Sequence, residues 1–193
     1  MSDVPAGAAL RLTCQPTKAG NVLVFPYRLV NEGPDEVYVM HALPKSGGQA
    51  NETAAIVIAG DNSDAMIGKF APPLPTDRRI AMPLVPLVRR LPAGGAIDGR
   101  IEITLPLAET SPYFPDLTLR QYEIIDIKGV VVTIGYWLAD TGELVARPST
   151  AGPELLDILT ADPVRSARLA TQRFPTNALQ LFRRNDAFPR KLR

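Results

Sequence analysis

The sequence predicts an all-β fold, because apolar and polar residues alternate with a period of two in several short segments. The clearest alternation lies in 99–107, GRIEITLPL. Clusters of Gly, Pro and Asn separate these segments, as expected for strands joined by turns. No long window before residue 150 shows a sustained helical period of 3.6 residues. Many short strands with such punctuation favour a sandwich or a barrel over 1–150.

Two more alternating segments lie near the start of the chain. In 10–15 and in 22–29, every second residue is apolar. Pro26 has no N–H to donate, so its strand is expected at a sheet edge or with a bulge at this residue. The polar segment 31–36, NEGPDE, predicts a turn that leads into an antiparallel strand at 37–43, VYVMHAL.

The segment 129–139, GVVVTIGYWLA, is apolar on both faces and rich in β-branched and aromatic residues, which predicts a central strand. The turn residues of 140–142 then precede ELVARP, 143–148, which suggests a hairpin. Weaker strand candidates are 54–60, 80–88 and 121–129.

The C-terminal part differs, because its signals favour short helices. Pro153 is expected to open one helix through 154–159, and Asp162 followed by Pro163 is a good helix start. Apolar residues would follow one side of this second helix until Pro175 ends it. The remaining segment, 177–193, fits a last strand, a helical turn or an extended arm equally well.

At the level of the fold, two segments resemble immunoglobulin-like domains. YRLVNEGPDEVYV, 27–39, is similar to their strand-turn-strand opening, and LPAGGAIDGRIEITLPL, 91–107, to a loop and strand that often follow. The Cys…Trp…Cys pattern of antibody domains is absent. The resemblance implies an immunoglobulin-like antiparallel β-sandwich over 1–150, followed by a partly helical basic extension, 151–193.

The charge of the chain is divided unevenly. Residues 161–193 hold eight basic and two acidic residues, a net of +6, whereas 1–160 hold 13 basic and 18 acidic residues, a net of −5. Such asymmetry bears on contacts rather than on the fold. We therefore expect the basic tail to bind an acidic protein surface, either of a partner or of its own body. The residues expected to make this contact are Arg165, Arg168, Arg173, Phe174, Phe182, Arg183 and Arg184.

The cysteine and histidine content limits the kinds of site that the chain can form. Cys14 is the only cysteine and His41 the only histidine, which excludes a disulfide within the chain and a structural zinc site of four Cys/His ligands. We expect no cofactor and no metal. His41 is expected at a strand end, hydrogen-bonded to backbone, and Cys14 as a small buried hydrophobe. The lone cysteine and the lack of a leader or a long apolar run favour a cytoplasmic protein without a membrane span.

Three further motifs allow a functional and a structural interpretation. GDNSDAM could offer a few oxygens from 61–64 to a cation, but a turn stabilised by Asx side chains is favoured. Asp116 and Glu123 could act as an acid–base pair only if the fold brought them together. PxxP spacings occur in FAPPLPTDRR, 70–79, and MPLVPLVRRLP, 82–92, which fit either polyproline ligands or rigid connections.

The leading hypothesis is a non-enzymatic protein-binding or assembly module, which could form a homo-oligomer. The alternatives are a carboxylate-based hydrolase or carbohydrate-active accessory domain and, with less support, a nucleic-acid-binding protein that acts through its basic tail. An acidic body would repel a polyanion, and this favours a protein partner.

Overall fold

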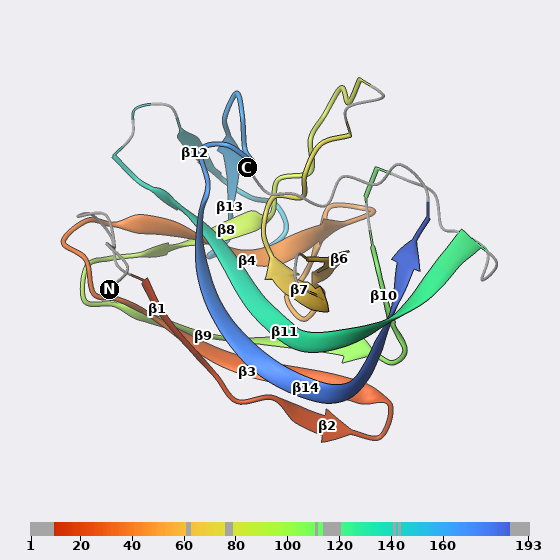
Figure 1. Cartoon of the computed structure of the whole chain (residues 1–193). Helices are drawn as coiled ribbons and strands as arrows, with labels where there is room; N and C mark the ends of the chain where they lie inside the picture. Colours follow the sequence, from red (N-terminus) through yellow and green to blue (C-terminus); the bar gives the residue numbers. More distant parts are fainter. Residues whose placement is uncertain are drawn as a thin grey trace.

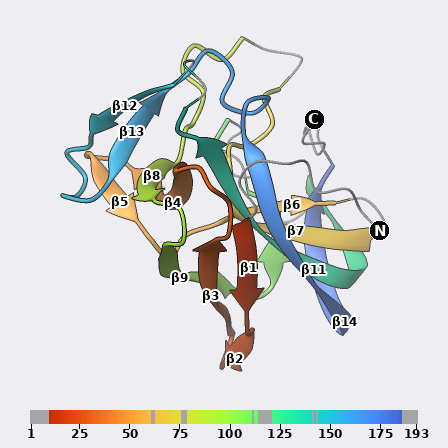
Figure 2. The ribbon, with the colours of Figure 1, turned by 90° about the vertical axis from the view of Figure 1, so that its left-hand side faces the viewer.

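The computed structural model of the chain consists of strands and connections, and its described residues contain no α-helix. These residues are 10–60, 63–75, 79–110, 112–113, 121–140, 142 and 144–185. Their strands form two sheets (Figure 1, Figure 2). Side chains of both sheets share one hydrophobic core. The all-β prediction is therefore confirmed.

The smaller sheet is antiparallel, with β3 at its centre. Its strands are β1 (Leu10–Cys14), β2 (Thr17–Ala19), β3 (Val22–Asn31) and β9 (Ala96–Thr104). β9 pairs with one edge of β3, and β1 and β2 share the other edge.

The expected edge position of the Pro26 strand is wrong, because β3 has neighbours on both sides. Pro26 lies opposite the break between β1 and β2, where its carbonyl accepts the N–H of Gln15 at 3.2 Å. The N–H that proline lacks therefore falls where the sheet has an interruption.

The larger sheet follows the order β10–β14–β11–β4–β8–β13–β12, and β5, β6 and β7 are attached to it. Its longest strands, β11 (Tyr122–Leu138) and β14 (Arg168–Arg184), run antiparallel as a curved ribbon (Figure 1). β11 has partners along both edges, which confirms the predicted central strand. The pairs β7–β11 and β10–β14 are parallel. The other strands are β4 (Val37–Lys45), β5 (Gln49–Asn51), β6 (Ile56–Ala59), β7 (Asp64–Lys69), β8 (Leu87–Leu91), β10 (Leu107–Ala108), β12 (Val145–Pro148) and β13 (Leu156–Leu159).

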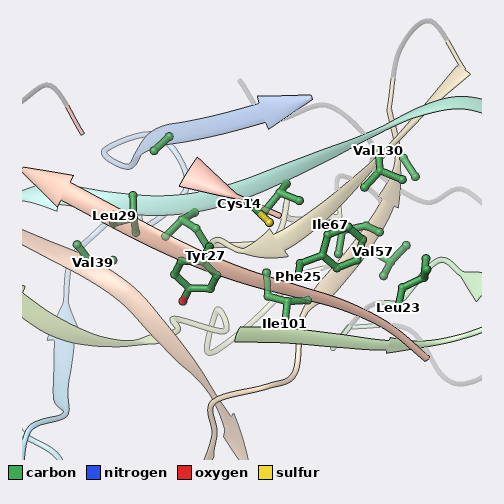
Figure 3. Close-up of a cluster of buried hydrophobic side chains, with 14 of the residues drawn as sticks. Cys14, Leu23, Phe25, Tyr27, Leu29, Val39, Val57, Ile67, Ile101 and Val130 are labelled. Carbon is green, nitrogen blue, oxygen red and sulfur yellow. The ribbon is translucent and has the colours of Figure 1, made fainter. Parts of the chain in front are cut away.

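The main core lies between the two sheets. Alternate residues of β3 point into it, as their period of two predicted, and meet apolar residues of β4, β6, β7 and β11. Burying one large aliphatic or aromatic side chain contributes about 1.5–3 kcal/mol, so this layer is the main source of stability. Members of the core labelled in Figure 3 are Cys14, Leu23, Phe25, Tyr27, Leu29, Val39, Val57, Ile67, Ile101 and Val130.

A second apolar cluster covers the opposite face of the larger sheet. Trp137 is fully buried in it, and its indole N–H donates to the Ser166 hydroxyl at 3.1 Å. The connection that follows β7 contributes Phe70 and Ala71 to this cluster, and Pro72 and the other prolines up to 75 are buried with them. Residues 70–75 of the first proline-rich segment are thus packed against the fold.

β7 approaches β11 closely because it carries a glycine at the contact. Gly68 is the register partner of Thr133, and a Cβ on Gly68 would lie 1.7 Å from the Thr133 carbonyl oxygen. A side chain at this position would therefore force the two strands apart.

The helices expected in the C-terminal part are absent from the described residues, which form β13 and β14 there. Asp162 does start a single turn: its carboxylate accepts the N–H of Arg165 at 3.0 Å, and its carbonyl accepts the N–H of Ser166 at 3.2 Å. The turn ends there because the chain from Arg168 onward pairs with β11. Cross-strand pairing of β14 with β11 over 168–175 and 179–184 outweighs a local helix signal.

Two predicted strand pairings are also wrong. β3 and β4 do not pair, because the turn at 31–36 carries the chain from the smaller sheet to the larger one. The segment after 140–142 forms β12, which pairs with β13 rather than with β11. Among the weaker candidates, 121–129 joins the central strand β11, 54–60 contains β6, and only the end of 80–88 enters β8.

Candidate functional site

Two of the tail arginines, Arg173 and Arg183, are bound by acidic side chains of the chain itself. The guanidinium group of Arg173 donates twice to the Asp64 carboxylate, at 2.7 and 2.9 Å, and these hydrogen bonds lower the pKa of Asp64. Arg183 donates to the carboxylate of Glu123, its neighbour across the strands. The structure thus places part of the expected basic contact surface on its own sheet.

Arg184 is buried at the end of β14 rather than displayed. Its backbone N–H donates to one carboxylate oxygen of Glu109 at 2.7 Å, and the other oxygen accepts the N–H of Ala59 at 2.7 Å. Glu109, only 1% exposed, joins β14 to β6. Sequence reasoning missed this residue, since one acid after a short apolar strand carries no signal of burial.

The other predicted contact residues are spread along the tail. Arg165 is exposed in the single turn, whereas Arg168 donates to the hydroxyl of Tyr136 and is half-buried. Phe174 packs on the main core, and Phe182 meets a tyrosine ring edge to face with 6.2 Å between the ring centroids. The structure does not gather the seven residues into one surface.

A polar cluster that sequence reasoning missed lies beside the main core. Lys69 is fully buried, and its ammonium group donates to the Tyr27 hydroxyl at 3.1 Å and to the carbonyl of Glu52. His41 lies within β4 rather than at a strand end, where the pairing with β8 is irregular. Its Nε2 atom is 3.4 Å from the Glu52 carboxylate, and its Nδ1 atom has no hydrogen-bond partner among the residues that the structure describes.

Burial decides the charge states of this cluster. Burial and then the positive charge of Lys69 lower the pKa of His41 from 6.5 to about 4, so its imidazole is neutral at pH 7. Burial also lowers the pKa of Lys69 from 10.5 to about 8, and it raises that of Tyr27. Lys69 and His41 are almost inaccessible to solvent, and both contact Glu52. We call this cluster the Glu52 clamp, because its contacts hold the segment around Glu52 against the core.

The described residues among the remaining sequence candidates offer no site. Cys14 is buried, and burial raises its pKa to about 11, which keeps the thiol protonated and unreactive. The predicted loop at 61–64 falls partly outside the described residues, and its Asp64 is bound by Arg173. Asp116 also lies outside them. The part of the chain that the structure describes holds no group of three or more His, Cys, Asp or Glu residues placed to bind a metal ion.

A groove of about 660 Å³ lies beside the β12–β13 hairpin. This hairpin lies at the end of the larger sheet away from β14 (Figure 2). Residues from 82 to 87, in the second proline-rich segment, form one wall of the groove. The groove is lined by Pro44, Met82, Pro83, Leu84, Val85, Leu87, Pro112, Tyr113, Arg147, Pro148, Asp157, Ile158 and Leu159.

Exposed apolar side chains gather at this groove. Met82, on its wall, is 86% exposed, and Leu159 is 48% exposed. Val145 is the register partner of Leu159 across the hairpin and is 51% exposed. Three of the five large hydrophobic residues that are exposed in the described chain thus lie at one place. Contiguous exposed apolar surface is a mark of binding surfaces.

The backbone edge of β12 is poorly suited to accept another strand. β12 spans four residues, and the N–H of the following Ser149 donates to Leu155 at 2.9 Å, on the β13 side. Neighbouring residues of a strand point to alternate edges, so Pro148, which lacks an N–H, faces outward. A short strand with an outward proline resists sheet extension. Binding here must use side chains.

Comparisons with known proteins supply no relative: no family model, no curated protein and no solved structure matches the chain. Among the described residues, no helix is both long and apolar enough to cross a membrane.

Proposed function

We propose that this chain is a protein-binding module, rather than an enzyme, and that its docking surface is the β12–β13 groove. The single observation that carries the proposal is that Met82, Val145 and Leu159 are exposed beside one hollow of the surface. Leaving such side chains in water forgoes burial worth roughly 25 cal/mol per Å². A partner that covers them recovers this free energy.

The lining of the groove favours a protein partner. Most of it is proline, aliphatic, methionine or tyrosine, and its charged groups are Arg147 and Asp157. Apolar centres with a few charges at the side are typical of protein–protein interfaces, in which methionine, tyrosine and arginine are enriched. We place the contact here rather than on the basic tail, because carboxylates of the chain itself bind Arg173 and Arg183, and Arg184 is buried.

The fold suits this role. Two packed sheets give a rigid support, and the groove lies at the outermost strands of one of them. We retain the immunoglobulin-like sandwich as the fold type of the proposal, with residues 168–184 as one of its strands. Such sandwiches commonly present binding surfaces at loops and edges, although the fold alone transmits no function.

The test is to select peptides on the full chain from a library of random peptides and to measure binding of the enriched peptides by fluorescence polarisation. We expect Leu159→Asp to weaken binding at least tenfold, because it places a charge at the apolar wall. Ile124→Asp is the matched control: Ile124 is 55% exposed but lies at the start of β11, and it does not line the groove. It should change binding less than twofold.

Circular dichroism must first show that both variants are folded. The proposal is wrong if no peptide is enriched, or if enriched peptides bind the Leu159→Asp variant as tightly as the unmodified chain.

A further inference from the structure

We propose that the natural partner at this groove is a second copy of the same chain, related to the first by a two-fold axis. The inference rests on the proposed function, since it uses the same docking surface and names what occupies it.

A pair of opposite charges on the hairpin carries the argument. Arg147 and Asp157 are register partners in β12 and β13, so their side chains share a face, and both line the groove. No ion pair joins the two within the described part of the chain. They therefore present a cation and an anion side by side to whatever covers the groove.

This charge pattern selects among partners. An acidic partner would satisfy Arg147 and leave Asp157 facing a like charge, and a basic partner would do the reverse. A surface that bears both charges in reversed order satisfies both. A two-fold axis produces this order from the chain itself, because it sets Arg147 against the partner's Asp157 and Asp157 against the partner's Arg147.

The apolar residues fit the same arrangement. Val145 and Leu159, which are register partners on the hairpin, would be covered together by the second hairpin. Met82 extends from the groove wall with 86% of its surface exposed, and the axis would set it over the groove of the other copy. A methionine side chain is flexible enough to fill an irregular hollow.

The edge of β12 is poorly suited to pair with another strand, and this agrees with an assembly that stops at two copies. Pro148 faces outward and interrupts backbone pairing, so the copies meet through side chains rather than by extending the sheet. A two-fold interface uses the same surface on both copies and leaves none free for a third.

The test is sedimentation velocity on the full chain over the micromolar concentration range, with two charge reversals, Arg147→Glu and Asp157→Arg. The unmodified chain should form dimers as its concentration rises. Each reversal alone places like charges together at both pairs, and it should weaken association roughly tenfold or more.

An equimolar mixture of the two variants tests the two-fold arrangement directly. In a mixed dimer, the Glu at position 147 of one copy faces the Arg at position 157 of the other, and the second pair is the native Asp157 with Arg147. The mixture should dimerise again, while Ile124→Asp should leave the dimer unchanged. A merely structural effect of either reversal would not be rescued by mixing.

The inference is overturned if the unmodified chain stays monomeric, if either single reversal dimerises as well as the unmodified chain, or if the mixture fails to associate. The proposed function can fail separately. A monomeric chain whose enriched peptides are sensitive to Leu159→Asp keeps the docking surface but excludes the second copy as its occupant.

Discussion

His41 should make the stability of this fold depend on pH in a defined direction. Burial and the positive charge of Lys69 lower its pKa in the folded chain to about 4, against an ordinary value of 6.5. As the pH falls below 6.5, the unfolded chain therefore takes up the proton first. The free energy of unfolding must then decrease, because stability falls with pH wherever the unfolded state binds more protons.

The magnitude follows from the gap between the two pKa values. One unit corresponds to about 1.4 kcal/mol, so the gap between 6.5 and about 4 amounts to about 3 kcal/mol. This stability is fully present above pH 6.5 and is lost progressively down to about pH 4. His41 is 3% exposed, so water screens the effect little. A loss of this size is a substantial part of the stability of a typical domain.

Urea unfolding, followed by tryptophan fluorescence between pH 4 and pH 7.5, measures the effect, with His41→Gln as the comparison. Glutamine does not titrate, so this variant should lose about 3 kcal/mol less over the same range. Acidic groups such as Asp64 titrate in both proteins and cancel in the difference. Parallel pH profiles for the two proteins would show that the folded chain does not hold His41 in a neutral state.

Three other substitutions test the packing. Gly68→Ala should lower the free energy of unfolding by about 3 kcal/mol or prevent folding, because its Cβ would lie 1.7 Å from the Thr133 carbonyl oxygen. A thermal midpoint equal to that of the unmodified chain would contradict the close approach of β7 and β11. Glu109→Gln replaces one of two buried acceptor oxygens with an amide donor and should lower the free energy of unfolding by about 1–3 kcal/mol in urea titrations. A loss near zero would contradict the two hydrogen bonds that Glu109 accepts from Ala59 and Arg184. The pKa of Lys69 in the folded chain, about 8, lies below its ordinary 10.5, so deprotonation of Lys69 favours the folded chain increasingly from pH 8 to pH 10. The raised pKa values of Cys14 and Tyr27 act in the opposite direction in both proteins, so the measurement is the difference in the free energy of unfolding between the unmodified chain and Lys69→Met; a difference that does not change with pH would contradict the lowered pKa of Lys69.

Local patterns were sufficient to find strands but not their partners. The period of two in β3 and β9 and the apolar run in β11 depend on neighbouring residues, and the structure confirms these strands. Pairing depends on contacts that no local pattern contains. The turn after β11 therefore suggested a hairpin, whereas β12 pairs with β13.

The helix predicted after Asp162 was wrong for the same reason, because a partner distant in the sequence determines the structure there. Asp162 and Pro163 are a valid helix start, and the structure uses them for one turn. The conformation of the next residues is decided by β11, an earlier strand that pairs with 168–175 and 179–184 of β14. A long-range partner of this kind overrides a modest helix preference.

The candidate site was predictable only in part. The second proline-rich segment stands out in the sequence, and it does form a wall of the groove. Its companions on the hairpin were not predictable, because Arg147 and Asp157 become neighbours only through the β12–β13 register. The Glu52 clamp was equally hidden, since the proximity of Lys69 and His41 depends on how the sheets pack.

The uneven charge of the chain acquires a structural meaning from these placements. The positive tail and the negative body are joined by Arg173 with Asp64 and by Arg183 with Glu123, so part of the asymmetry is complementarity within one fold. Exposed pairs of this kind contribute little stability each, but opposite charges across strands favour one register over its alternatives. The basic strand thus helps to define one end of the larger sheet. The other end carries the charges of the β12–β13 hairpin and the exposed apolar side chains, and we therefore propose that the partner binds at that end.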